Sequence, residues 1–269
     1  MVRDKLISLK VPQVLNRFYR HYFQAEFLGE ENLAMLKDQN ALLVMNHTAF
    51  FALECYLLGS RVLSHYPQSD MQALVWKGFT EGPAGFWFKT MGGKTAKIAT
   101  GANLLSAGKT VLIMPEGIDA TDVRNRFNTF HTGYLRIIQQ QNVPIIPIGF
   151  SGIDQSIPWI VGRNRFIENK FMKPVNPDFN FVLMPKLPVF RPTKIVFNIG
   201  QPINIPAAEI KSEPGISRWN DKLKQSIENL VDEADVHRAK RISSSKLNSA
   251  FHKIVEGKTT FIGEHGHAS

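Results

Sequence analysis

The sequence predicts an α/β fold, with a largely parallel or mixed sheet flanked by helices, an N-terminal amphipathic helix and a C-terminal helical extension. Three observations predict this fold. Short apolar runs typical of buried strands recur along the chain, stretches with helical spacing separate them, and a three-four apolar pattern follows Pro214. The length of 269 residues and the ordinary composition, 43% hydrophobic and 20% charged, suit one compact globular unit with appended segments.

Five apolar runs are predicted to be strands: 41–45, 72–76, 110–114, 143–150 and, after a proline-rich connection, 194–199. Helical stretches lie between them, around residues 50–58, 99–107 and 133–140. Because strands alternate with helices, we expect a largely parallel sheet within a domain spanning residues 28–206.

The N-terminal segment, residues 1–27, is predicted to be an amphipathic helical membrane-contact segment. Its apolar residues recur at helical spacing, and its basic residues lie on other faces: Val14, Leu15, Phe18, Tyr22 and Phe23 against Arg17, Arg20 and His21. The alternative is an ordinary surface helix packed on its own domain, and both can hold.

Residues 207–269 are predicted to form a C-terminal helix and a basic tail. The helix follows from apolar residues at three-four spacing, Ile216, Trp219, Leu223, Ile227, Leu230 and Val231, with Ser212 and Ser217 as possible caps. Residues 237–258 hold six Lys or Arg against one Glu. We expect a solvated, partly disordered tail there rather than a dedicated lipid or nucleic-acid contact.

The net charge of +9 favours anionic partners, which include nucleic acid, anionic lipid headgroups and an acidic carrier. The positive residues are dispersed and form no nucleic-acid motif, so we expect no nucleic-acid partner. Cys55 is the only cysteine, which excludes an intrachain disulfide and fits a reducing compartment. The sequence shows neither a signal peptide nor a run long enough to span a bilayer, so any membrane contact is expected to be peripheral.

Two groups of residues stand where predicted strands end. Asn46 and His47 follow one strand, and Pro115, Glu116 and Gly117 follow another. Ligands of open α/β sheets bind at the carboxyl ends of strands, beside helix N-termini. Glycine permits close backbone approach, and a glutamate accepts hydrogen bonds or orients a partner. These residues are therefore candidates for a site.

An ordered series of motifs resembles the glycerolipid acyltransferase superfamily, the group that includes lysophosphatidate acyltransferases. The series runs through Phe27-Leu28-Gly29-Glu30-Glu31-Asn32-Leu33, Asn46-His47, Trp76-Lys77, Met91-Gly92-Gly93, Ala107-Gly108, Pro115-Glu116-Gly117, Phe130-His131-Thr132-Gly133, Val143-Pro144-Ile145-Ile146-Pro147-Ile148 and Phe197-Asn198-Ile199-Gly200-Gln201-Pro202-Ile203. It covers about residues 20 to 206, and the connections look more like the branch acting on neutral acylglycerols or other alcohols.

The resemblance implies transfer of a fatty acyl group from a thioester of coenzyme A or acyl carrier protein to a hydroxyl of a glycerolipid or other lipid alcohol. His47 is then the general base, without a metal or a cofactor beyond the acyl thioester. The enzyme is expected to lie peripherally on the cytoplasmic face of a membrane. Candidate substrate-binding residues are Asn46, Lys77, Glu116, Gly117 and Arg124.

Further expectations concern the oxyanion and the acyl chain. Backbone amides near Thr48 or Gly117 are candidates for holding the oxyanion. The aromatic segment 79–91 is a candidate entrance for the acyl chain or a membrane contact, with a core cluster as the alternative. The phosphate-binding branch has Thr-Arg-Ser after its Glu-Gly pair, whereas Ile118-Asp119-Ala120 follows here, so Arg124 or Arg126 would have to replace that arginine.

The sequence departs from the family at the acid that supports the histidine. The family places an aspartate five residues after it, where this chain has Ala52; the nearest later carboxylate is Glu54. On a regular helix two extra positions turn a side chain by about 200°, so Glu54 needs a shift in the preceding loop to pair with His47. The alternatives are that Glu54 faces solvent, that Glu116, Asp119 or Asp122 serves instead, or that no carboxylate does. The chain would otherwise be a catalytically degenerate lipid-binding protein or a thioester hydrolase.

Overall fold

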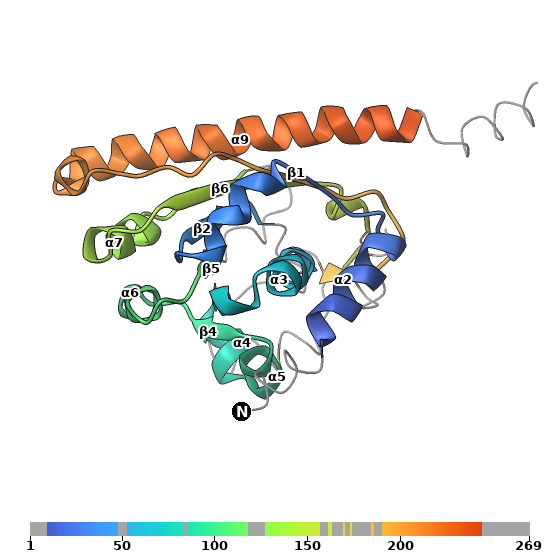
Figure 1. The fold of residues 1–269 in the computed structure, drawn as a ribbon, viewed down its shortest axis with the longest axis horizontal. Helices are drawn as coiled ribbons and strands as arrows, with labels where there is room; N and C mark the ends of the chain where they lie inside the picture. Colours follow the sequence, from blue (N-terminus) through green and yellow to red (C-terminus); the bar gives the residue numbers. More distant parts are fainter. Residues whose placement is uncertain are drawn as a thin grey trace, which may run out of the picture.

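A computed structural model describes residues 10–47, 53–82, 85–117, 127–156 and 190–243, with short pieces at 161–162, 169, 173 and 184–185. Arg124, Asp119, Asp122 and Ala52 therefore lie outside the described residues, as do Thr48 and Arg126. The described part is a mixed sheet with helices on both faces, which confirms the predicted fold class (Figure 1).

The main sheet has seven strands in the order β1-β9-β6-β2-β5-β3-β4. The strands are β1 (Glu26–Leu28), β2 (Leu42–Met45), β3 (Gln72–Val75), β4 (Gly93–Thr95), β5 (Val111–Ile113), β6 (Ile145–Ser151) and β9 (Val196–Ile199). A separate two-stranded sheet pairs β7 (Val161–Gly162) with β8 (Met184–Pro185).

Strand directions bring the candidate residues to one edge of the sheet. Strands β6, β2, β5, β3 and β4 run parallel, whereas β9, with β1 parallel to it, runs antiparallel to β6. The carboxyl ends of the five parallel strands therefore share an edge. Residues that follow β2 and β5 are neighbours there because these two strands pair directly.

Helices cover the two faces of the sheet unequally (Figure 1). Helix α3 (Leu53–His65), helix α2 (Val11–Tyr22) and the 3-10 helix η1 (Glu30–Lys37) pack with the face that includes Leu43 and Met45. The opposite face is covered by α6 (Ile98–Ser106), α7 (Gly133–Gln140) and the long α9 (Glu213–Ser243). Since β2 is buried on both sides, its continuous apolar run is what a central parallel strand requires.

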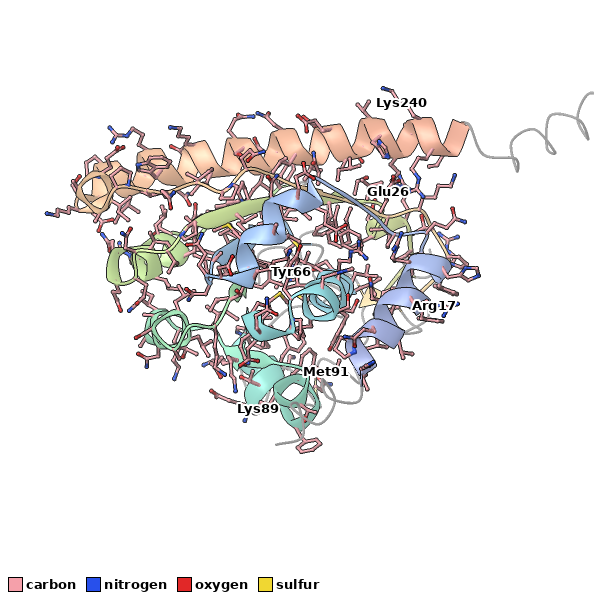
Figure 2. All side chains as sticks on the ribbon, viewed as in Figure 1. Arg17, Glu26, Tyr66, Lys89, Met91 and Lys240 are labelled. Carbon is pink, nitrogen blue, oxygen red and sulfur yellow. The ribbon has the colours of Figure 1, made fainter. Side chains whose placement is uncertain are left out.

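Side chains from both layers fill the space between helices and sheet (Figure 2). Alternate residues of β2 explain the division: Leu42 and Val44 contact the cluster beneath α7 and α9, while Leu43 and Met45 contact the cluster beneath α3. The short helices α4 (Lys77–Glu81) and α5 (Gly85–Thr90) lie between β3 and β4 along the chain. The 3-10 turns η2 (Pro67–Ser69), η4 (Asp154–Ser156) and η6 (Ala207–Ile210) complete the connections.

Most predicted elements are confirmed, and three boundaries were wrong. The helix expected around residues 50–58 continues to His65 in α3. All five predicted strands are present within two residues at either end, and residues 133–140 form α7 as predicted. The N-terminal helix ends at Tyr22 rather than near residue 27, because Phe27 belongs to β1 and pairs with Phe197 of β9. At the other end, α9 continues to Ser243, so residues 237–243 are helical and not part of a disordered tail.

Candidate active site

His47 lies two residues beyond β2, at the edge of the sheet where the parallel strands end. Its side chain is 12% exposed, so the imidazole is mostly shielded and still reaches the surface of the protein. The structure thus places the predicted base at the edge that open α/β sheets use for ligands.

Glu54 is the carboxylate that contacts the His47 ring. It lies in the first turn of α3, and its Oε1 forms a short hydrogen bond with Nδ1 of His47. The Glu54 side chain is completely buried, so the alternative that it faces solvent is wrong. Because an ionised carboxylate only accepts hydrogen bonds, this contact requires a proton on Nδ1, and in the neutral ring the lone pair is then on Nε2.

Glu116 holds the backbone around His47 rather than its ring. One carboxylate oxygen accepts from the His47 backbone N–H at 3.0 Å, and the other accepts from the Asn128 backbone N–H at 2.9 Å. The Asn128 amide donates to this second oxygen at 3.4 Å. Glu116 is fully buried, so a single carboxylate ties the end of β2, the turn after β5 and the segment before α7 together.

Asn46 is bonded to the neighbouring strand. Its Oδ1 accepts from the backbone N–H of Phe150 at 3.0 Å, and its Nδ2 donates to the Phe150 carbonyl at 3.4 Å. This pairing extends the contact of β2 with β6 beyond the last ladder residue. The Asn46 amide therefore fixes the position of the backbone just before His47. The substrate contact predicted for Asn46 stays a prediction.

Gly117 closes the turn after β5 in a left-handed conformation, with φ of 54°, that suits glycine. Its N–H donates to the Met114 carbonyl at 3.1 Å, so this amide is already bonded within the turn. This bond argues against the expectation that the Gly117 amide holds the oxyanion. Lys77 begins α4, exposed at the same edge of the sheet after β3. Substrate contacts of Lys77, and of Arg124 outside the described residues, stay predictions.

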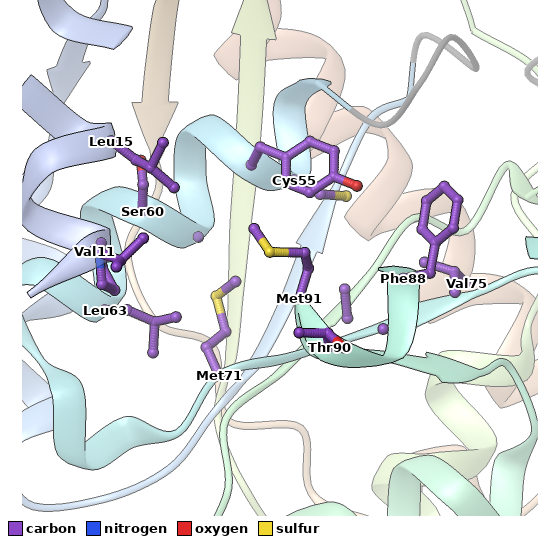
Figure 3. Close-up of a pocket in the computed structure, with 15 residues that line it drawn as sticks. Val11, Leu15, Cys55, Ser60, Leu63, Met71, Val75, Phe88, Thr90 and Met91 are labelled. Atoms are coloured by element: carbon purple, nitrogen blue, oxygen red, sulfur yellow. The ribbon is translucent and has the colours of Figure 1, made fainter. Parts of the chain in front are cut away.

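An apolar pocket reaches the elements that hold His47 (Figure 3). Residues of α2, α3, β3, α5 and β4 contribute its lining. The lining includes Leu15, Cys55, Met71, Val75, Phe88 and Met91. One residue before Cys55 is Glu54, and the Cys55 Sγ lies 3.6 Å from Sδ of Met114, just before the Pro115-Glu116 turn.

The aromatic segment 79–91, predicted as an acyl-chain entrance or membrane contact with a core cluster as the alternative, lies partly in the pocket and partly on the surface. Phe88 lines the pocket, whereas Phe86 is 76% exposed on the surface of α5. Cys55 lies in the pocket wall. Burial and the nearby Glu54 carboxylate raise the pKa of its thiol well above the usual value.

Neither a metal site nor a membrane span is found in the described part of the chain. No three His, Cys, Asp or Glu side chains among the described residues gather as metal ligands would. Of the helices that the structure describes, none combines the length and the apolar character needed to cross a bilayer.

Comparisons with known proteins agree with this fold. A family model described as Acyltransferase matches residues 24–151, which include His47, Glu54 and Glu116. Among solved structures, the crystal structure of the 1-acyl-sn-glycerophosphate (LPA) acyltransferase PlsC from Thermotoga maritima superposes with a TM-score of 0.57. The two chains are 18% identical, and the match covers 87% of this chain and 83% of that one. No curated protein sequence matches the chain.

Proposed function

We propose that the chain is an acyltransferase of the glycerolipid type, since a family model described as Acyltransferase matches residues 24–151, and that it transfers a fatty acyl group from a thioester to the hydroxyl of a lipid alcohol. The observation that carries the proposal is the contact between Nδ1 of His47 and the buried Glu54 carboxylate. A histidine whose Nδ1 is held by a carboxylate is suited to act as a general base through Nε2.

In the proposed reaction, Nε2 of His47 takes the proton of the acceptor hydroxyl while its oxygen attacks the thioester carbonyl. The new C–O bond forms as the C–S bond breaks, and the imidazolium returns the proton to the departing thiolate. Both substrates are bound at once, so no acyl-enzyme is needed. General base catalysis of this kind contributes about 10² to 10⁴ in rate.

Glu54 serves this step in two ways. Its contact with Nδ1 keeps the ring in the tautomer that leaves the Nε2 lone pair for the hydroxyl proton. When the ring takes that proton, the negative charge of the buried carboxylate stabilises the imidazolium, because a low-dielectric surrounding strengthens the attraction. Glu54 thus takes the part that the family gives to an aspartate five residues after the histidine.

Glu116 and Asn46 position His47 in the proposed enzyme. Glu116 accepts the His47 backbone N–H, and Asn46 joins the preceding residue to β6. Because a small displacement of a base can cost about 10²-fold in rate, two anchors on adjacent backbone positions favour precise placement.

The apolar pocket is the proposed site of the acyl chain. Its lining is mainly aliphatic, aromatic and sulfur-containing, which suits a hydrocarbon and offers few partners to a polar ligand. Its wall includes Cys55, the neighbour of Glu54 in the sequence, and the carbonyl end of the chain is proposed to lie at the side of the pocket nearest His47. The donor is proposed to be acyl-CoA or acyl-ACP, and the acceptor a glycerolipid or other lipid alcohol.

The proposed place of action is the cytoplasmic face of a membrane, with the protein bound peripherally. Both candidate donors are cytoplasmic thioesters, and a lipid alcohol is presented at a bilayer surface. The exposed apolar side chains of α2 support such a contact.

The test is acyl transfer from labelled long-chain acyl-CoA or acyl-ACP to a panel of glycerolipid and simple long-chain alcohols. The variant His47→Ala is expected to abolish transfer while its circular dichroism spectrum stays that of the parent. His65→Ala, at the exposed far end of α3, is the matched control and is expected to keep full activity.

Three outcomes would contradict the proposal. Retention of transfer by His47→Ala would exclude its role as base. Release of free fatty acid without a new ester would identify a thioester hydrolase. Tight binding of the acyl thioester without any turnover by the parent would indicate a lipid-binding protein that has lost catalysis.

A further inference from the structure

The outer face of α2 combines apolar and cationic side chains. Val14 is 67% exposed and Phe18 54% exposed, although the residues between them on the inner side of the helix pack on α3. Arg17 and His21 are also exposed and follow the same helical spacing, so they flank Phe18 on this face. Exposed apolar side chains beside cations on one helix face are typical of a helix that binds a membrane interface.

The C-terminal end of α9 closes a groove beside this face. We name it the α2–α9 groove; its lining includes Arg17, Phe18, Arg20, His21, Glu26 and Arg241. Arg241 is fixed at the groove because its Nε pairs with Glu26 Oε2 at 2.9 Å and its Nη2 donates to the Gln24 carbonyl at 3.1 Å. Two segments more than 200 residues apart in the sequence thus form one surface (Figure 2).

The charge of the groove is strongly positive. Glu26 is the acidic residue in its lining, and Arg241 and His237 both pair with this one carboxylate. Among the residues that the structure describes, no carboxylate pairs with Arg17, Arg20 or His21. The arginine charges on the helix side therefore face solvent without a protein counterion in that part of the chain.

We propose that the α2–α9 groove binds the phosphate headgroups of an anionic bilayer, with Phe18 and Val14 entering the interface. Cations attract the negative leaflet, and apolar side chains between them gain from burial at the headgroup boundary. The inference deepens the peripheral membrane contact of the proposed function by naming the lipid charge and by giving the C-terminal helix a part in it. A nucleic acid would satisfy the cations but would leave the two exposed apolar side chains without a partner.

The test is cosedimentation of the full chain with vesicles of phosphatidylcholine alone and of equal parts phosphatidylcholine and phosphatidylglycerol. Strong binding is expected only to the anionic vesicles. The double variant Arg17→Gln/Arg20→Gln is expected to lower the partition coefficient about 30-fold, the effect of two cations at an anionic leaflet. Phe18→Ser is expected to lower it about 10-fold by removing apolar burial at the interface.

The matched control is Lys37→Gln/Lys211→Gln, which removes the same charge from exposed positions outside the groove. Equal losses of vesicle binding in both double variants would show that binding depends only on the net charge of the protein, and would overturn the proposal. Equal binding to both vesicle types would overturn it too, as would displacement from the vesicles by short duplex DNA. His47→Ala is expected to bind vesicles as the parent does, so failure of catalysis and failure of this inference are separable.

Discussion

Replacing Glu54 by Gln tests whether the carboxylate that departs from the family spacing supports the base. The change keeps the shape of the side chain and removes its negative charge. Glu54 is fully buried and touches the His47 ring, which is 12% exposed, so solvent screens the pair only weakly. The substitution therefore removes a charge at the point where the proposed reaction develops a positive one.

The expected loss follows from the attraction between that carboxylate and the imidazolium. Two unit charges about 4 Å apart in an effective dielectric of about 20 attract by about 4 kcal/mol. This energy corresponds to about 10³-fold in rate. The amide can also donate to Nδ1 and favour the wrong tautomer, which in a serine protease triad accompanies a loss of about 10⁴ in kcat. We expect kcat to fall about 10³-fold to 10⁴-fold.

The stability of Glu54→Gln is expected to rise or to stay unchanged, although its activity falls. Burying a carboxylate costs free energy, and replacing it by a neutral isostere removes that cost. The Tm of Glu54→Gln should therefore equal or exceed that of the parent. A loss of activity accompanied by unfolding would not count as support.

The assay is single-turnover acyl transfer at saturating donor, with Tm measured on the same preparations. Glu116→Gln is the comparator, because it also removes a buried negative charge close to His47 but leaves the ring contact intact. Its loss is expected to be about 10-fold to 100-fold, the value of a charge-assisted hydrogen bond to the backbone. A Glu54→Gln enzyme within a few-fold of the parent would refute the pairing as a catalytic device.

Two more predictions concern the pocket wall. A Cβ at Gly59 would lie 3.2 Å from Cε of Met71, so the side chain of Gly59→Leu should fill the pocket. Excluding about three methylenes of the acyl chain from the pocket costs about 2.4 kcal/mol. The kcat/KM for long-chain donors should therefore fall about 50-fold, whereas that for short-chain donors should not change. A uniform loss across chain lengths would argue against an acyl site. Because the thiol pKa of Cys55 is raised, its thiolate is scarce at pH 8, and alkylation followed by mass spectrometry should be slow in the folded chain, faster in Glu54→Gln, and fast in denaturant. Labelling of the folded parent at the rate of an exposed cysteine would contradict the burial of this thiol.

The sequence predicted the elements that carry strong apolar patterns. Strands β2 and β6 are buried along their whole length, so their uninterrupted apolar runs were clear signals. Strand β4 consists of Gly93, Lys94 and Thr95 at the edge of the sheet, and no apolar run marks it. Residues 237–243, the last part of α9, were predicted to belong to a tail because their charged residues dilute the apolar spacing, although Arg238 is buried against the domain.

The candidate site was predictable in part. His47 and Glu116 stand directly after apolar strands, and motif order indicated both. The pairing of Glu54 could not be read from its spacing, because it depends on where α3 begins relative to the end of β2. The role of Glu116 was missed for another reason: both of its oxygens bond backbone N–H groups, and main-chain partners leave no trace in the identity of the residues they come from.

Helix α2 contributes to two binding surfaces. Its residues Val11, Pro12 and Leu15 line the apolar pocket, whereas Val14, Arg17 and Phe18 line the α2–α9 groove. Each residue added to a helix turns everything beyond it by about 100°. An insertion or deletion in the middle of α2 would therefore misalign part of both surfaces together. We expect this segment to accept substitutions far more readily than changes of length, so that evolution or engineering of acyl preference and of lipid preference must proceed there one side chain at a time.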